Sequence, residues 1–188
     1  MNKSELKLVF SFIGILWGIH FLNIILPWEL RALGLLPRTL RGLWGILFAP
    51  FLHANLAHLI SNSVPLLVLS LAFLSLYRKH LVDAFIIILL IHGSGVWIFG
   101  RLAVHFGASG LLYGLITYLI IFGFLRKKPV SICLAVAVAI YYGGTLLLGI
   151  LPIYRFISWE GHLFGAIGGI FGDCSKDSGS RISSPCFV

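Results

Sequence analysis

The stretch His53-Ala-Asn-Leu-Ala-His58-Leu-Ile-Ser-Asn62 places polar side chains at the start of an apolar run that continues to Tyr77. A run of this length can cross a bilayer as one helix, which needs about 20 residues. Imidazole and amide groups are costly inside a membrane unless they have partners there. The stretch therefore predicts a membrane helix with a functional site near its first turn.

The whole chain is too apolar for a water-soluble domain. Of its 188 residues, 59% are hydrophobic and 11% are charged, whereas soluble domains carry about 25% charged residues. The net charge is +8, but the basic residues are scattered between apolar runs, which argues against nucleic acid as a partner. The three cysteines lack metal-ligand spacing and imply no disulfide framework. The composition predicts an all-α polytopic membrane protein.

Charged and turn residues divide the chain into six apolar runs, each of which predicts a transmembrane helix. The runs are Leu8–Leu26, Leu56–Tyr77, Leu81–Phe99, Ser109–Leu125, Val130–Leu151 and Phe156–Phe171. The fourth and sixth are short for a full crossing, and short helices are tolerated where their ends lie in a protein-lined space. The long connection Pro27–Leu52 is rich in aromatic residues and is expected to lie in the membrane interface.

The basic residues also predict the orientation in the membrane. With the N-terminus inside, the inner segments hold nine Lys and Arg residues and the outer segments hold five. Because cytoplasmic loops carry the excess of positive charge, both termini are expected inside. We expect one six-helix membrane domain over residues 1–172 and a polar, disordered tail over residues 173–188.

Two further polar clusters lie at the starts of later helices. Gly107-Ala-Ser109-Gly110 opens the fourth run, and Gly161-His162 opens the sixth. With an inside N-terminus, the second, fourth and sixth helices all begin at the outer side. The polar residues of the three clusters are therefore expected at one depth, although they are far apart in the sequence.

Small residues recur at every fourth position beside both later clusters, and such stripes let helix backbones approach closely. The stripes are Gly110 and Gly114 in the fourth helix, and Gly161, Gly165 and Gly169 in the sixth. Ser109 and His162 each adjoin a stripe, so the sequence predicts that the two meet. A hydroxyl and an imidazole in contact form a nucleophile–base pair.

The first cluster supplies groups that suit the same chemistry. His58 and Asn62 are four residues apart and lie on one helix face. Both can donate hydrogen bonds to the oxyanion that forms when Ser109 attacks a carbonyl, and the free N–H groups at the start of the fourth helix add to this. Together the clusters predict a site for serine-dependent acyl transfer.

Other candidate groups fit less well. His53, His58 and His162 are conceivable metal ligands, but the nearest carboxylate, Glu160, would point elsewhere on its helix, and we interpret it as an interfacial charge. We expect no metal and no cofactor.

His105 competes with His162 as the base because it precedes Ser109 by four residues, but the glycine at 107 argues against a continuous helix between them. We interpret three further histidines without evident partners as interfacial or packing residues: His20, His80 and His92.

The three clusters resemble the motifs of the rhomboid family of intramembrane serine proteases. The family's patterns are His-x4-His-x3-Asn, Gly-x-Ser-Gly followed by an aromatic residue, and His-x2-Gly-x3-Gly. They match His53, His58 and Asn62, then Gly107, Ser109, Gly110 and Tyr113, and finally His162, Gly165 and Gly169. The match implies a compact six-helix bacterial form with a catalytic core at about 44–173.

By this resemblance Ser109 is the nucleophile and His162 is the general base of a dyad without an acid. His58 and Asn62 would form the oxyanion hole, and Tyr113 would pack on the His162 ring. The first loop departs from the family, because many members carry Trp-Arg where this chain has Trp44 and Gly45. We expect altered anchoring of that loop.

The resemblance also implies the substrates and the location. Membrane proteins with a transmembrane helix would be the substrates, and the bacterial cell (inner) membrane would be the site of action. Access is expected beside the fifth helix, where Gly143 and Gly144 fit either a mobile gate or close packing. The alternatives are a catalytically silent rhomboid-like protein that binds transmembrane clients and a small channel or transporter.

Overall fold

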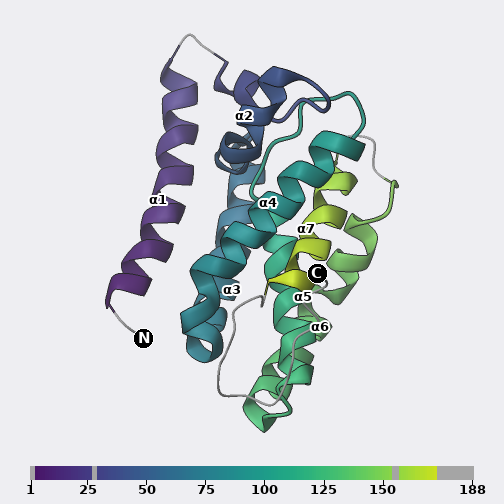
Figure 1. Cartoon of the computed structure of the whole chain (residues 1–188). Helices are drawn as coiled ribbons and strands as arrows, with labels where there is room; N and C mark the ends of the chain where they lie inside the picture. Colours follow the sequence, from purple (N-terminus) through teal and green to yellow (C-terminus); the bar gives the residue numbers. More distant parts are fainter. Residues whose placement is uncertain (1–2, 27–28, 154–156, 173–188) are drawn as a thin grey trace.

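The computed structural model describes residues 3–26, 29–153 and 157–172, and Figure 1 shows them as a helical bundle. The α-helices are α1 (Lys3–Ile25), α2 (Leu40–Phe48), α3 (Leu56–Tyr77), α4 (Leu81–Phe99), α5 (Ser109–Leu125), α6 (Pro129–Gly149) and α7 (Trp159–Phe171). Short 3-10 helices are η1 (Leu30–Leu33), η2 (Ala49–Phe51) and η3 (Arg78–His80). Apart from the short α2, these are the six helices expected, so the predicted all-α six-helix bundle is confirmed.

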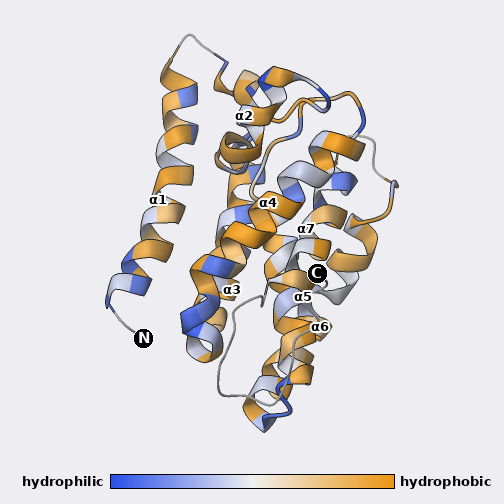
Figure 2. Ribbon diagram, in the orientation of Figure 1, coloured by the Kyte–Doolittle hydropathy of each residue, from blue (hydrophilic) through white to orange (hydrophobic). Residues whose placement is uncertain are grey.

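The outer surface of the bundle is apolar. Three helical segments are long and apolar enough to cross a membrane: Lys3–Ile25, Leu56–Phe99, which contains α3 and α4, and Pro129–Gly149. On α6, Ile140 is 80% exposed and Tyr141 is 79% exposed. Figure 2 shows hydrophobic residues along the flanks of the helices. Exposed apolar surface of this extent is typical of a protein that faces lipid.

Helix α5 lies at the centre of the bundle. Its side chains are buried around most of its circumference, and Leu115, Ile116 and Leu119 are completely buried. A helix that is apolar and buried on all sides is the core of its fold. It packs against α3, α4, α6 and α7, whereas α1 stands at the edge of the bundle and packs mainly on α3.

Glycine contacts hold α5 and α7 together. A Cβ atom on Gly165 would collide with the backbone of Gly110, and one on Gly169 would collide with the backbone of Gly114. The two backbones are therefore in direct contact at both levels, as in small-xxx-small helix pairs. This approach brings the first turns of α5 and α7 side by side.

The connection between α1 and α3 is ordered over residues 29–52. It is tied to the α4–α5 connection by paired backbone hydrogen bonds of 2.8 Å between Leu35 and His105. The Arg38 guanidinium donates to the carbonyl oxygens of Ile98 at 3.0 Å and Gly100 at 2.8 Å. The segment is therefore held against the bundle at several points, while residues 27–28 lie outside the described part.

Gly45 has a packing role in this connection. A Cβ atom there would collide with the backbone of Leu35, so α2 lies directly on the Gly34–Leu35 segment. An arginine at this position, as in the family pattern, would force α2 away from it. The Arg38 guanidinium supplies two of the hydrogen bonds that anchor this loop.

The helix ends differ from the predicted ranges by a few residues. Helix α7 begins at Trp159, where the Ser158 hydroxyl caps the helix by accepting a hydrogen bond of 3.2 Å from the Gly161 amide. The predicted start, Phe156, lies outside the described residues. Residues 154–156 and the predicted tail, 173–188, lie outside the described residues. Helix α1 begins earlier than predicted, at Lys3.

Candidate active site

Gly107 shapes the turn that leads into α5 and Ser109. Its φ is +118°, a conformation that side-chain-bearing residues rarely adopt. Its amide donates a hydrogen bond of 2.8 Å to the Ala49 carbonyl. A Cβ atom on Gly107 would lie 2.9 Å from Nε2 of His58. Glycine is therefore required here both for the backbone conformation and for the approach of His58.

The structure brings the polar start of α3 to this same turn. The Asn55 side chain caps α3 by accepting from the His58 amide at 2.8 Å. Asn62 is 3% exposed, and its Nδ2 donates to the His58 carbonyl at 2.9 Å. The Cβ position of Gly107 lies 3.9 Å from that Nδ2. His58 and Asn62 are thus neighbours of the turn that carries Ser109, which is itself half-buried.

The His162 ring is held in one orientation. Its Nδ1 lies 3.0 Å from the Gly149 carbonyl oxygen. Because a carbonyl oxygen only accepts, Nδ1 carries the proton and Nε2 of the neutral ring carries the lone pair. The hydrogen bond therefore assigns the tautomer in which Nε2 can accept a proton.

Tyr113 fixes the plane of the same ring. The two rings are stacked with centroids 4.0 Å apart and planes 5° apart. The Tyr113 hydroxyl donates to the Thr145 carbonyl on α6 at 2.9 Å. Tyr113 follows Ser109 by one helical turn and lies on the same face of α5. The stack thus sets the His162 ring beside the helix face that begins at Ser109.

Ser109 and His162 make no hydrogen bond to each other among the residues that the structure describes. Catalytic hydrogen bonds are often long before substrate binds and shorten in the substrate complex. The backbone contact between Gly110 and Gly165 keeps the starts of α5 and α7, which carry Ser109 and His162, next to each other.

His92 fills the space between the starts of α5 and α7. It is 7% exposed, and its Nδ1 donates to the Gly161 carbonyl at 2.9 Å. A Cβ atom on Gly110 would collide with its ring. The interpretation of His92 as a residue without a partner was wrong, because its partner is a backbone carbonyl on a distant helix.

His105 is engaged through both ring nitrogens. Nε2 donates to the Arg101 carbonyl at 3.0 Å, so Nδ1 accepts from the Ser158 hydroxyl at 2.6 Å. Burial lowers the pKa of His105 below its ordinary value, since a charged ring is poorly solvated there. With both nitrogens occupied, His105 is not available as the base for Ser109.

Glu160 is buried and paired. It is 3% exposed, its Oε1 accepts from the Arg101 backbone amide at 3.3 Å, and the Arg101 Nε lies 3.6 Å away. Arg101 also donates to the Ile157 carbonyl at 2.5 Å. The interpretation of Glu160 as an interfacial charge was therefore wrong. The pair ties the start of α7 to the α4–α5 connection.

A small cavity of about 10 Å³ lies beside Ser109. The polar residues in its lining are His92, His105, Ser109 and Ser158, and the rest of the lining is apolar residues and glycine. Ser109 therefore shares this cavity with two histidines, one from α4 and one from the α4–α5 connection.

His53 is buried against the His58 ring. It is 2% exposed, and its ring centroid lies 5.1 Å from that of His58 at an interplanar angle of 67°. This edge-to-face contact packs the two imidazole rings together. Within the described residues, no group of three or more His, Cys, Asp or Glu side chains is placed to hold a metal ion.

These features define a helical membrane bundle with a Ser, His and Asn site at the starts of three helices. The Rhomboid domain model matches residues 40–172, and the chain belongs to the rhomboid family. It is accordingly an integral membrane protein.

The chain is also similar to curated bacterial proteins. An uncharacterized protein of Mycobacterium tuberculosis is 35% identical over 171 residues, which cover 86% of this chain and 71% of the relative. An uncharacterized protein of Mycobacterium leprae is 35% identical over 173 residues, which cover 86% of this chain and 67% of the relative. No solved structure matches the chain.

Proposed function

We propose that the protein is an intramembrane serine endopeptidase that hydrolyses peptide bonds in or near transmembrane segments of membrane proteins. The orientation of His162 is the observation that carries the proposal. Its Nδ1 is bound by the Gly149 carbonyl and its ring is stacked on Tyr113, which leaves Nε2 as a proton acceptor beside the helix that begins at Ser109. A histidine that served packing alone would not need both constraints.

The proposed mechanism has two stages. In the first, Ser109 Oγ attacks the scissile carbonyl while His162 Nε2 takes the hydroxyl proton, and the proton is then given to the leaving amine as the C–N bond breaks. In the second, His162 takes a proton from a water molecule as the water oxygen attacks the acyl-enzyme carbonyl, and it gives that proton to Ser109 Oγ as the C–Oγ ester bond breaks and the carboxylic acid is released. The dyad ends each cycle in its starting protonation state.

The oxyanion of each tetrahedral intermediate needs hydrogen-bond donors. The Asn62 amide has two N–H groups, and the bond to the His58 carbonyl uses one of them. The other N–H group, the His58 ring and the unpaired backbone N–H groups in the first turn of α5 are the proposed donors. All three lie at the Gly107 turn, next to the nucleophile.

The proposed route for substrate runs beside α6. A transmembrane segment must unwind locally, because its carbonyl groups are otherwise hidden in helical hydrogen bonds. Helix α6 packs closely on α5 but only weakly on α7. Cβ atoms on Gly143 and Gly144 would meet nothing within 4 Å. These glycines do not serve close packing within the described residues, which favours the mobile-gate interpretation.

Reconstitution tests the proposal. Purified protein is placed in liposomes with a single-pass reporter substrate, and fragments are followed on gels. We expect cleavage by the wild type and a loss of at least 10³-fold in Ser109→Ala and His162→Ala. Ser94→Ala, at an exposed serine on α4, is the matched control and should cleave normally. Cleavage at the wild-type rate in Ser109→Ala would contradict the proposal.

The same assay tests the alternative that the protein is catalytically silent and only binds transmembrane clients. The observation that favours this alternative is that Ser109 and His162 make no hydrogen bond to each other in the part of the chain that the structure describes. A silent protein would retain the reporter in pull-down experiments and would leave it uncut. We propose the bacterial cell membrane as the location, with both chain termini inside.

A further inference from the structure

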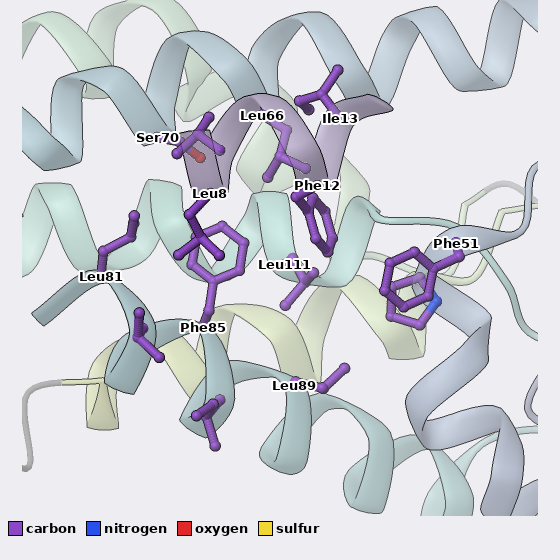
Figure 3. Close-up of a pocket in the computed structure, with 14 residues that line it drawn as sticks. Leu8, Phe12, Ile13, Phe51, Leu66, Ser70, Leu81, Phe85, Leu89 and Leu111 are labelled. Carbon is purple, nitrogen blue, oxygen red and sulfur yellow. The ribbon is translucent and has the colours of Figure 1, made fainter. Parts of the chain in front are cut away.

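An apolar crevice of about 230 Å³ lies between α1, α3 and α4. Figure 3 shows side chains from these helices converging on it. Leu8 and Phe12 come from α1, Phe85 and Leu89 from α4, and Leu66 from α3. Nearly all of the lining of the crevice is hydrocarbon, and Ser70 is its one polar residue.

The crevice exists because α1 packs on α3 and on η2 but not closely on α4. Phe12 bridges the gap at one level, with its ring centroid 5.3 Å from that of Phe51 and 5.9 Å from that of Phe85. At the rim, Val82 is 51% exposed and Ile86 is 50% exposed. In a bilayer these residues face the acyl chains, so the crevice opens to lipid.

One end of the crevice is basic. Lys7 precedes the lining residue Leu8, and Lys79 lies two residues before the lining residue Leu81. Arg78 pairs with Glu5 at 3.1 Å, which holds the start of α1 beside η3. Lys7 and Lys79 are both exposed.

Other charges lie near the same end. The exposed Asp83, on the first turn of α4, is a carboxylate close to Lys79 in the sequence. Arg126, at the end of α5, lies over the Tyr77 ring at 4.5 Å and brings a further positive charge to this side of the bundle. Basic groups therefore outnumber acidic ones where the apolar crevice meets the membrane surface.

We propose that the crevice binds an acyl chain of one anionic phospholipid, with the lipid phosphate between Lys7 and Lys79. An α-helix is about 10–12 Å across with its side chains, too wide for a crevice of about 230 Å³. A single hydrocarbon chain fits it. Each basic side chain near a membrane surface attracts an anionic headgroup by about 1 kcal/mol, so the basic end selects the headgroup.

The lipid would contact segments that support the candidate active site. Phe51 lines the end of the crevice away from Leu81, and Leu111 lines it between them. Leu111 lies two residues after Ser109, and Phe51 lies in η2 with Ala49, whose carbonyl accepts from the Gly107 amide. A bound chain therefore stiffens η2 and the start of α5. The binding itself does not depend on the proposed protease activity.

The test measures lipid binding by native mass spectrometry. Delipidated protein in detergent is titrated with phosphatidylglycerol or with phosphatidylcholine of the same chains. We expect one phosphatidylglycerol to bind about 30-fold more tightly than phosphatidylcholine, which is the factor that corresponds to about 1 kcal/mol for each of the two lysines. Equal affinity for the two lipids, or gradual uptake of many without a first tight one, would overturn the proposal.

Variants locate the site. Lys7→Gln combined with Lys79→Gln should abolish the preference for phosphatidylglycerol, whereas the charge-matched control Lys127→Gln with Lys128→Gln, at exposed positions on the same side, should keep it. Ile13→Trp should fill the crevice and remove the tight site for both lipids. Ile140→Trp, which is 80% exposed on α6, should not. Equal effects of site and control variants would place the lipid elsewhere and refute the proposal.

Discussion

The Tyr113 ring lies flat on the His162 imidazole, with centroids 4.0 Å apart and planes 5° apart. Tyr113 comes from α5, and the Gly149 carbonyl that binds His162 Nδ1 comes from the end of α6. Three helices therefore determine the position of one imidazole ring. The chemistry proposed for Ser109 depends on this arrangement.

Removal of the Tyr113 ring should impair catalysis more than removal of its hydroxyl. Tyr113→Phe keeps the stack and loses the bond to the Thr145 carbonyl, which should cost about 0.5–1.5 kcal/mol of stability and little activity. Tyr113→Ala frees the imidazole, and misplacement of a catalytic group by about 1 Å costs about 10²-fold in rate. Initial cleavage rates in liposomes measure both. Normal rates in Tyr113→Ala would show that the stack does not position His162.

Separation of α5 from α7 should damage both stability and activity. Gly165→Ala places a methyl group on the Gly110 backbone, and overpacking of this kind costs about 1–3 kcal/mol. Gly144→Ala is the matched control because its methyl group would meet nothing within 4 Å. Thermal unfolding in detergent should show a lower Tm for Gly165→Ala alone. An equal effect of the two substitutions would contradict the packing described.

The buried pair of Arg101 and Glu160 should stabilise the start of α7. Glu160→Ala leaves the Arg101 amide without its carboxylate partner, and such a loss costs about 1–3 kcal/mol. Glu29→Ala is the control, because Glu29 pairs with Arg31 at 3.2 Å with its side chain 76% exposed, and an exposed pair contributes about 0–1 kcal/mol. Unfolding in denaturant measures the free energy of unfolding of both variants. An equal loss of stability in both variants would show that the buried pair does not stabilise the start of α7.

Mild acid should destabilise the protein in part through His105. Burial lowers the pKa of His105 below the ordinary value of 6.5. Just below pH 6.5, His105 is therefore protonated in the unfolded chain but stays neutral in the folded protein. Stability should therefore fall as the pH drops through 6.5 toward the lower folded pKa, and it should be fully present above 6.5. In His105→Asn the pH dependence of Tm should be shallower. An identical slope in wild type and variant would exclude this role.

The helix boundaries were predictable from the sequence where charged residues delimit the apolar runs. Helix α5 spans Ser109–Leu125 as predicted, because Gly107 precedes it and three basic residues, Arg126, Lys127 and Lys128, follow it. The convergence of the polar clusters followed from topology, since alternate helices begin on the same side of a membrane. Periodicity and topology are properties that a sequence displays directly.

Contacts between distant connecting segments were not predictable. The bond between His92 and the Gly161 carbonyl and the burial of Glu160 beside Arg101 join residues more than 50 positions apart. Neither contact produces a periodic pattern in the sequence, because each depends on how closely two distant segments pack in the folded protein. The His92 ring packs against Gly110 at a place where a Cβ atom would collide with it. That requirement for glycine cannot be recognised before the packing of the helices is known.

The most direct test of the central claim is labelling with a fluorophosphonate, which reacts with an activated serine hydroxyl. Purified protein is labelled, digested and mapped by mass spectrometry in the wild type, His162→Ala and the control Ser94→Ala. We expect modification of Ser109 in the wild type and in Ser94→Ala, and none in His162→Ala. Modification of a different serine, or undiminished labelling of Ser109 without His162, would contradict the proposed dyad.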